Sequence, residues 1–200
     1  MKKILYSVLT LGFLSSYANA YNHTGIEFGV GSDNVLNSNI YYKNYNNIDD
    51  LVYSANISVS KQESKTYYGK YKYNIYSFDA LGGYAIGLPY QELDDALNIL
   101  AGAYYYSIKP KYDGISSSTL NGFGIQAGVH YSVKIIDNVT AGGEIFLHHD
   151  FQDLNSTYIS AGVEGIYDIN DSLYVNAKLG YQGRSNFSNS NLLVGIGYNF

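Results

Sequence analysis

Apolar and polar residues alternate with a period of two along most of this 200-residue chain, and this pattern limits the fold more than any other feature. In the segment 123–135 every odd position is apolar, whereas the even positions carry Gly, Gln, His, Ser and Lys. A helix would scatter the odd positions around its circumference, but a strand places them on one face. The alternation recurs in segments 51–59, 139–147, 159–167, 173–181 and 192–200. The sequence therefore predicts an all-β protein.

Ten strands are expected, joined as consecutive antiparallel hairpins. Some connections are short and carry turn-forming residues, as at Asp137-Asn138. The connections 61–72, 109–120 and 184–191 are longer and polar. The second strand is the least regular, because residues 39–43 alternate poorly. The predicted strands are 24–32, 38–46, 51–62, 72–88, 96–109, 121–135, 139–150, 156–168, 172–184 and 191–200.

The composition of the polar face favours a membrane barrel over a soluble one. Only 14% of the residues are charged, against about 25% in a typical soluble domain. The polar positions are mostly Gly, Ser, Asn and Thr, which suits a narrow wet lumen. Aromatic residues near strand ends suit interfacial girdles: Tyr67, Tyr68, Tyr84, Tyr104, Tyr105, Tyr106 and Tyr167. The pattern predicts an antiparallel up-and-down transmembrane β-barrel of about ten strands, with eight as the alternative.

Residues 1–20 have the features of a secretory signal peptide. Lys2 and Lys3 precede an apolar stretch, and Ala18-Asn19-Ala20 supplies the small residues that signal peptidase reads. We predict a signal peptide at 1–20, a barrel domain at 21–200 and a location in the cell outer membrane. The absence of Cys excludes a disulfide scaffold and a thiol enzyme. A net charge of −5 gives no reason to expect a nucleic-acid partner.

The sequence ends on a strand with an aromatic last residue. Its alternate apolar positions are Leu192, Val194, Ile196, Tyr198 and Phe200. This ending resembles the C-terminal assembly signature of Gram-negative outer-membrane barrels, which implies recognition by the barrel-assembly machinery. A weaker similarity, to small porin-like proteins of the OmpX and YfaZ types, rests on the Gly-rich stretch 80–89 and on 109–114. It favours ten strands over eight and implies no functional site.

An even number of strands places both termini on the periplasmic side and the longer loops outside. Seven of the basic residues then fall at the outer end of the barrel: Lys61, Lys65, Lys70, Lys72, Lys109, Lys111 and Arg184. This basic rim predicts outer-membrane lipid and lipopolysaccharide as partners, because their phosphates attract cations. Simple solubilisation of the loops is the alternative.

Hairpin register predicts which polar residues meet inside the barrel. The predicted lumen pairs are His130–Glu144, Gln126–His148 and Glu164–Lys178. Glu27 and Asp79 also point inward, without a partner that spacing identifies. The bulky inward residues are Tyr104, Phe146, Tyr158 and Tyr174. Because a barrel of about eight strands is just filled by its side chains, we expect a largely obstructed lumen.

The segment His130-Tyr131-Ser132, with Glu144, is similar in spacing to the PagL-type lipid A deacylase barrels. That resemblance implies a base, a nucleophile and an orienting acid. However, Val133 stands where that family has Asn, and the period-two pattern turns all three groups away from lipid. We therefore predict no catalytic residue. His148 and His149 face opposite ways, as neighbours on a strand do, so neither a metal nor a cofactor is expected.

The sequence thus predicts a barrel with an envelope structural or narrow porin-like role and no enzymatic activity. The alternative is a surface interaction protein that acts through its extracellular loops. The oligomeric state is left open.

Overall fold

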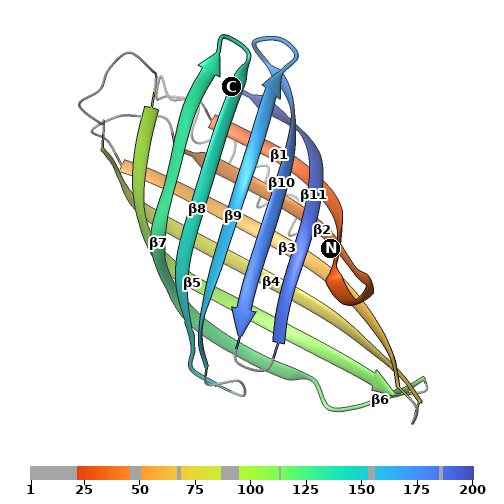
Figure 1. Cartoon of the computed structure of the whole chain (residues 1–200). Helices are drawn as coiled ribbons and strands as arrows, with labels where there is room; N and C mark the ends of the chain where they lie inside the picture. The colour runs from red at the N-terminus through yellow and green to blue at the C-terminus, as the bar shows by residue number, and fades with distance from the viewer. Residues whose placement is uncertain are drawn as a thin grey trace.

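The computed structural model describes residues 22–45, 51–66, 69–86, 95–112, 114–152, 156–184 and 187–200. They form one antiparallel sheet that closes into a barrel, because β1 pairs with β11 and β4 pairs with β5 (Figure 1). Among these residues, no helix has the length and hydropathy needed to cross a membrane. The predicted signal peptide, residues 1–20, lies outside the described residues.

Ten long strands make the wall, and each pairs with its neighbour along the chain. A short strand, β6 (Ile115–Ser116), adds to the end of β5, and the single-turn 3₁₀ helix η1 (Ser32–Asn34) joins β1 to β2. The ten are β1 (Asn22–Gly31), β2 (Val35–Asn44), β3 (Leu51–Thr66), β4 (Gly69–Ile86), β5 (Asp95–Tyr112), β7 (Leu120–Ile136), β8 (Val139–Asp150), β9 (Thr157–Asp168), β10 (Leu173–Arg184) and β11 (Phe187–Asn199). The predicted all-β, up-and-down barrel is confirmed, with ten strands rather than eight.

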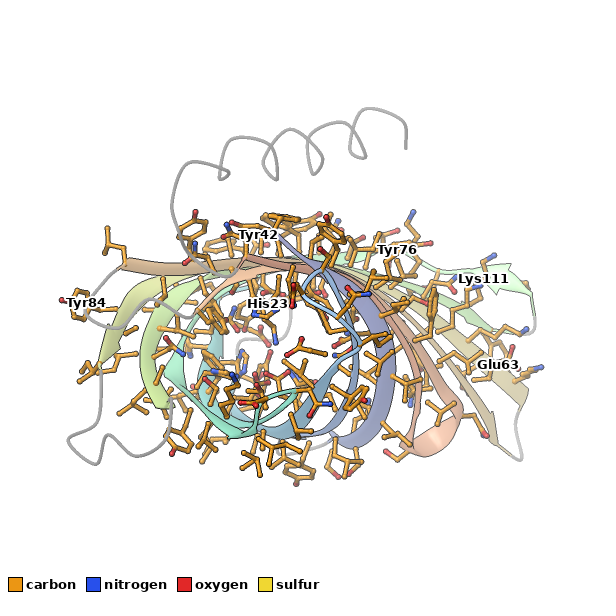
Figure 2. The ribbon with its side chains drawn as sticks, turned by 90° about the horizontal axis from the view of Figure 1, so that it is seen from above. His23, Tyr42, Glu63, Tyr76, Tyr84 and Lys111 are labelled. Carbon is orange, nitrogen blue, oxygen red and sulfur yellow. The ribbon has the colours of Figure 1, made fainter. Side chains whose placement is uncertain are left out.

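The outer face of the wall is apolar over its middle and aromatic toward both ends. Small and aliphatic residues such as Ala161 and Val163 occupy the middle. Tyr76, Phe78, Tyr105, Phe123 and Tyr181 are exposed toward one end, and Tyr53, Tyr84, Tyr167 and Tyr198 toward the other. This arrangement matches an apolar band between two aromatic girdles. Figure 2 shows Tyr76 and Tyr84 pointing away from the ring of strands, whereas His23 points into it.

The girdle prediction needs a correction at two positions. Tyr104 and Tyr106 are buried in the interior, and only Tyr105 of that run is exposed, because successive residues of a strand point to opposite faces. Tyr67 and Tyr68 lie outside the described residues.

The two ends of the barrel differ in how far their strands reach. The C-terminus lies at the same end as the turns between β7 and β8 and between β9 and β10 (Figure 1). At the opposite end β3, β4 and β5 reach well past their neighbours (Figure 1). We name this end the hairpin end. The part of the sheet formed by 61–66, 69–74 and 107–112 is the extension.

Three predicted boundaries are wrong at the hairpin end. The predicted loop 61–72 is almost entirely strand, as is 184–191, because β3 runs on to Thr66, β4 begins at Gly69 and β11 begins at Phe187. The predicted strand 38–46 begins earlier, at Val35, since the three residues of η1 suffice for the turn. Asn34 adopts a positive φ of 57° there, which Asn tolerates better than most residues.

Candidate functional site in the barrel interior

Strand register places the predicted lumen residues opposite one another. His130 on β7 is opposite Glu144 on β8, and Glu164 on β9 is opposite Lys178 on β10. Gln126 is likewise opposite His148. All of them belong to the inward-facing series, because their neighbours along each strand are the exposed apolar residues of the outer face.

The side-chain contacts, however, join different partners from those predicted. The His130 Nε2 atom lies 2.9 Å from Glu164 Oε1, and Lys178 Nζ lies 2.6 Å from Glu144 Oε1. Each pair therefore skips a strand, linking β7 to β9 and β8 to β10. The predicted pairs His130–Glu144 and Glu164–Lys178 are wrong as contacts, although they are correct as register.

Two glycines explain this exchange of partners. An added Cβ at Gly142 would lie 3.1 Å from Glu164 Cγ and 3.3 Å from His130 Nε2. An added Cβ at Gly162 would lie 3.3 Å from Glu144 Oε1 and 3.3 Å from Lys178 Cε. Each glycine lies beneath one of these two contacts, so the side chains cross the intervening strand without obstruction. The space between the two pairs is too small for a water molecule.

Lys43 on β2 was missed by sequence reasoning. Its Nζ lies 3.1 Å from Glu164 Oε2 and faces the rings of Tyr41 and Tyr45 at 5.3 and 5.8 Å. Since β2 and β9 are not neighbours in the sheet, this pair crosses the lumen. The sequence contained part of the information needed to place Lys43. If Ile40 faces outward, Tyr41 and Lys43 must face the interior, because successive residues of a strand point to opposite faces. The poor alternation of 39–43 concealed it.

Neutral groups complete the surroundings of His130. Asn98 Nδ2 on β5 lies 3.3 Å from His130 Nδ1, and the Tyr45 ring packs against the imidazole with centroids 5.0 Å apart. Tyr45 in turn donates a 2.9 Å hydrogen bond from its hydroxyl to Ser54 Oγ. We call the set Lys43, Asn98, His130, Glu144, Glu164 and Lys178 the crossing network. It connects β2, β5, β7, β8, β9 and β10.

Glu27 and Asp79, for which spacing identified no partner, bind amides. Asn39 Nδ2 donates to Glu27 Oε2 at 3.1 Å and Asn176 Nδ2 donates to Glu27 Oε1 at 2.5 Å. Asn56 Nδ2 donates to Asp79 Oδ1 at 3.0 Å. These carboxylates are therefore held by uncharged donors, and the crossing network keeps its own balance of two lysines against two glutamates.

An aromatic layer lies nearer the hairpin end. The Tyr104 hydroxyl donates to Asp150 Oδ1, and the His148 ring stacks on Tyr158 at 4.6 Å with parallel planes. Tyr104, Phe146 and Tyr158 are buried in this layer, as expected of inward bulky residues. Tyr174 is buried too, but it lies near the opposite end of the barrel, at the start of β10. The layer and the crossing network both lie in the interior of the barrel.

The residues of the deacylase-like motif are not arranged for nucleophilic catalysis. Both ring nitrogens of His130 lie against partners, Asn98 and Glu164, so the imidazole is not poised to accept a proton from Ser132. His148 bonds Ser160 and His149 bonds Thr157, on opposite faces of β8. Among the residues that the structure describes, no three His, Asp or Glu side chains form a metal-binding group.

The residues of the assembly signature lie on the outer face of β11 and, in the case of Phe200, one position past its end. Leu192, Val194, Ile196, Tyr198 and Phe200 are all exposed there, and the rings of Tyr198 and Phe200 are 5.7 Å apart. The backbone N–H of Phe200 donates to Asn22 O at 3.2 Å, and the N–H of Asn22 donates to Phe200 O at 3.3 Å. Phe200 therefore helps to close the barrel.

The described lysines of the basic rim do not encircle the barrel but lie on one side of it. Lys61, Lys70, Lys72, Lys109 and Lys111 all lie on the extension formed by β3, β4 and β5. The backbones of Lys65 and Arg184 lie at the same end of the barrel, but their side chains are outside the described part of the structure.

A glycine exchange tests how the crossing network is built. Gly142→Val is expected to destabilise the barrel by about 1–3 kcal/mol, because the new side chain overpacks the space between His130 and Glu164. Urea unfolding of the barrel in lipid vesicles measures this change. Gly143→Val is the matched control, since an added Cβ there meets no atom closer than 3.7 Å and faces outward. An equal loss of stability in both variants would contradict this account.

Two solved structures share this fold over almost their whole length. The translocator domain of autotransporter NalP from Neisseria meningitidis is 13% identical, has a TM-score of 0.53, and the match covers 100% of this chain and 96% of that chain. A major outer membrane protein from Thermus thermophilus is 10% identical with a TM-score of 0.50, and the match covers 92% of this chain and 100% of that chain. Neither a protein-family model nor a curated protein matches the sequence. The fold is that of an outer-membrane β-barrel, as the sequence predicted.

Proposed function

We propose that this protein is an outer-membrane barrel with a closed lumen and a structural role in the cell envelope. The observation that carries the proposal is the Lys43–Glu164 pair, which spans the lumen between β2 and β9 at 3.1 Å. A diffusion channel needs a continuous aqueous path, whereas here paired charges and the aromatic layer occupy the interior. The apolar band and the two aromatic girdles support placement in a bilayer.

Conductance tests the closed lumen directly. Refolded protein in planar bilayers is expected to show no stable conductance of general-porin size. Replacing both Lys43 and Glu164 with serine removes the crossing pair without leaving a lone buried charge, and should raise conductance. The matched control is the double exchange of Glu63 and Lys72 to serine, which removes a 2.5 Å pair from the extension and should leave the conductance unchanged. Passage of oligosaccharides through the parent barrel would overturn the proposal in favour of a channel.

A second candidate function is surface interaction, and the extension favours it. β3, β4 and β5 contain 16, 18 and 18 residues, and a tilted strand needs only about 9–11 to cross a bilayer. The surplus builds an ordered platform rather than a loose loop. Replacing residues 62–73 with a tight turn should abolish adhesion to a partner surface if this function holds, while leaving envelope integrity intact. Unchanged adhesion would dismiss it.

A further inference from the structure

The extension presents two rows of side chains on one face. Lys72 is opposite Glu63 on one side and Lys111 on the other, and Asn74 is opposite Lys61 and Lys109. Residues directly opposed in an antiparallel pair share a face, so these groups and Lys70 all point the same way. Glu63 and Lys111 lie well to one side of the ring of strands in Figure 2.

Positive charge exceeds negative charge on this face. Glu63 pairs with Lys70 at 2.6 Å and with Lys72 at 2.5 Å. The hydrogen bonds from Lys70 and Lys72 lower the pKa of Glu63 to about 2, so this carboxylate is charged at ordinary pH. Among the described residues, no carboxylate pairs with Lys61, Lys109 or Lys111. Among the described side chains of this face, five lysines therefore share one acid.

One register contact within this face brings two lysines together, and Glu63 pairs with only one of them. Lys72 and Lys111 are directly opposite each other on β4 and β5, and like charges in that position destabilise a sheet. A bound anion would turn this repulsion into attraction for both lysines. The juxtaposition thus points to a ligand that carries phosphate or another multivalent anion.

The position of the face identifies where that anion comes from. Tyr76 of the aromatic girdle lies on the same face of β4, two positions beyond Asn74 and four beyond Lys72, and Lys109 Nζ lies 5.2 Å from the Tyr76 ring centroid. The lysines therefore continue the lipid-facing surface immediately past the girdle. This is the level at which lipid headgroups begin.

We propose that the outer face of the extension binds the phosphate groups of a glycolipid in the outer leaflet, with Lys72 and Lys111 clamping one phosphate. The proposal rests on the proposed placement in the outer membrane. Lys61 and Lys109, in the adjacent row, extend the same surface toward a second phosphate. Lys70 completes it at the tip.

The test compares refolded barrels in vesicles that contain lipopolysaccharide with barrels in vesicles that contain the same lipid after enzymatic removal of its phosphates. Phosphorylated lipid should protect the parent barrel against urea, and dephosphorylated lipid should not. The double variant K72Q/K111Q should bind phosphorylated lipid about thirtyfold more weakly. Each lysine near an anionic lipid surface raises the binding affinity about fivefold, and the variant removes two. The matched control, K134Q, removes a lysine from the opposite end of the barrel and should retain the protection.

Protection that is equal in the double variant and the parent would overturn the proposal. Equal protection by free inorganic phosphate would also overturn it, because that result assigns the site to a soluble anion. Heat-modifiable gel mobility is recorded for every sample. A parent barrel that fails to insert into any vesicle refutes the membrane placement itself, and that failure is distinguishable from a barrel that inserts but ignores the lipid phosphates.

Discussion

Deleting Phe200 and replacing Tyr198 with serine is expected to prevent stable assembly in the outer membrane. The truncation removes both backbone hydrogen bonds between Phe200 and Asn22, and the two changes remove the aromatic pair that ends β11. Because β1 and β11 form the seam of the barrel, the wall loses contacts where closure is completed. Unassembled chains expose unpaired strand edges, which are not tolerated in the hydrocarbon region of a bilayer. We therefore expect such chains to remain outside the membrane and to be degraded. The measurement is the amount of heat-modifiable protein in the outer-membrane fraction.

Tyr181→Ser is the control for this experiment. Tyr181 is also an exposed outward tyrosine, 50% accessible against 45% for Tyr198, but it lies on β10 near the hairpin end. Its loss should leave the amount of assembled barrel close to the parent value. Normal membrane levels of the truncated variant would show that the C-terminal pattern does not direct assembly.

Glu164→Ala is expected to cause the largest loss of stability of any single interior exchange. The Glu164 side chain is 7% exposed and bonds both Lys43 and His130. Removing it leaves Lys43 enclosed with no acid in contact, and breaking a buried pair in this way costs about 3–5 kcal/mol. The measurement is the free energy of unfolding in urea.

The double variant with Lys43→Met provides the decisive comparison. Because it removes the orphaned charge, it should recover much of the stability lost in Glu164→Ala. Glu63→Ala is the exposed counterpart, since Glu63 also touches two lysines but is 43% exposed. Surface ion pairs contribute little, so that exchange should be nearly silent. If Glu164→Ala lowers the free energy of unfolding no more than Glu63→Ala does, the crossing network does not contribute measurably to the stability of the barrel.

The strands were predictable because apolar residues alternate with polar ones along each of them. This pattern can be recognised within a single strand, without knowing which strands pair with it. Their ends at the hairpin end were not predictable from the same signal. Residues 61–74 contain four Lys together with Gln, Glu, Ser, Thr and Asn, a polar composition that is typical of a loop. Nevertheless β3 runs on to Thr66 and β4 begins at Gly69, because the two strands pair with each other there. Backbone pairing then overrides the polar composition.

The interior site was predictable only as far as register reaches. Turn positions were sufficient to place His130 opposite Glu144 and Glu164 opposite Lys178. Turn positions do not indicate the direction in which a long side chain extends inside a narrow barrel. The actual partners are therefore apparent only from the three-dimensional arrangement around Gly142 and Gly162. The contact of Lys43 with Glu164 joins residues 121 positions apart, beyond anything that hairpin spacing addresses.

That separation bears on the order in which the molecule is built. Contacts between distant residues must wait for the loops between them to close, so Lys43 and Glu164 meet only after most of the wall has formed. Interactions absent from the transition state act mainly on the rate of unfolding. We therefore expect the crossing network to form late in folding. It contributes little to the folding rate, but it slows the unfolding of the completed barrel.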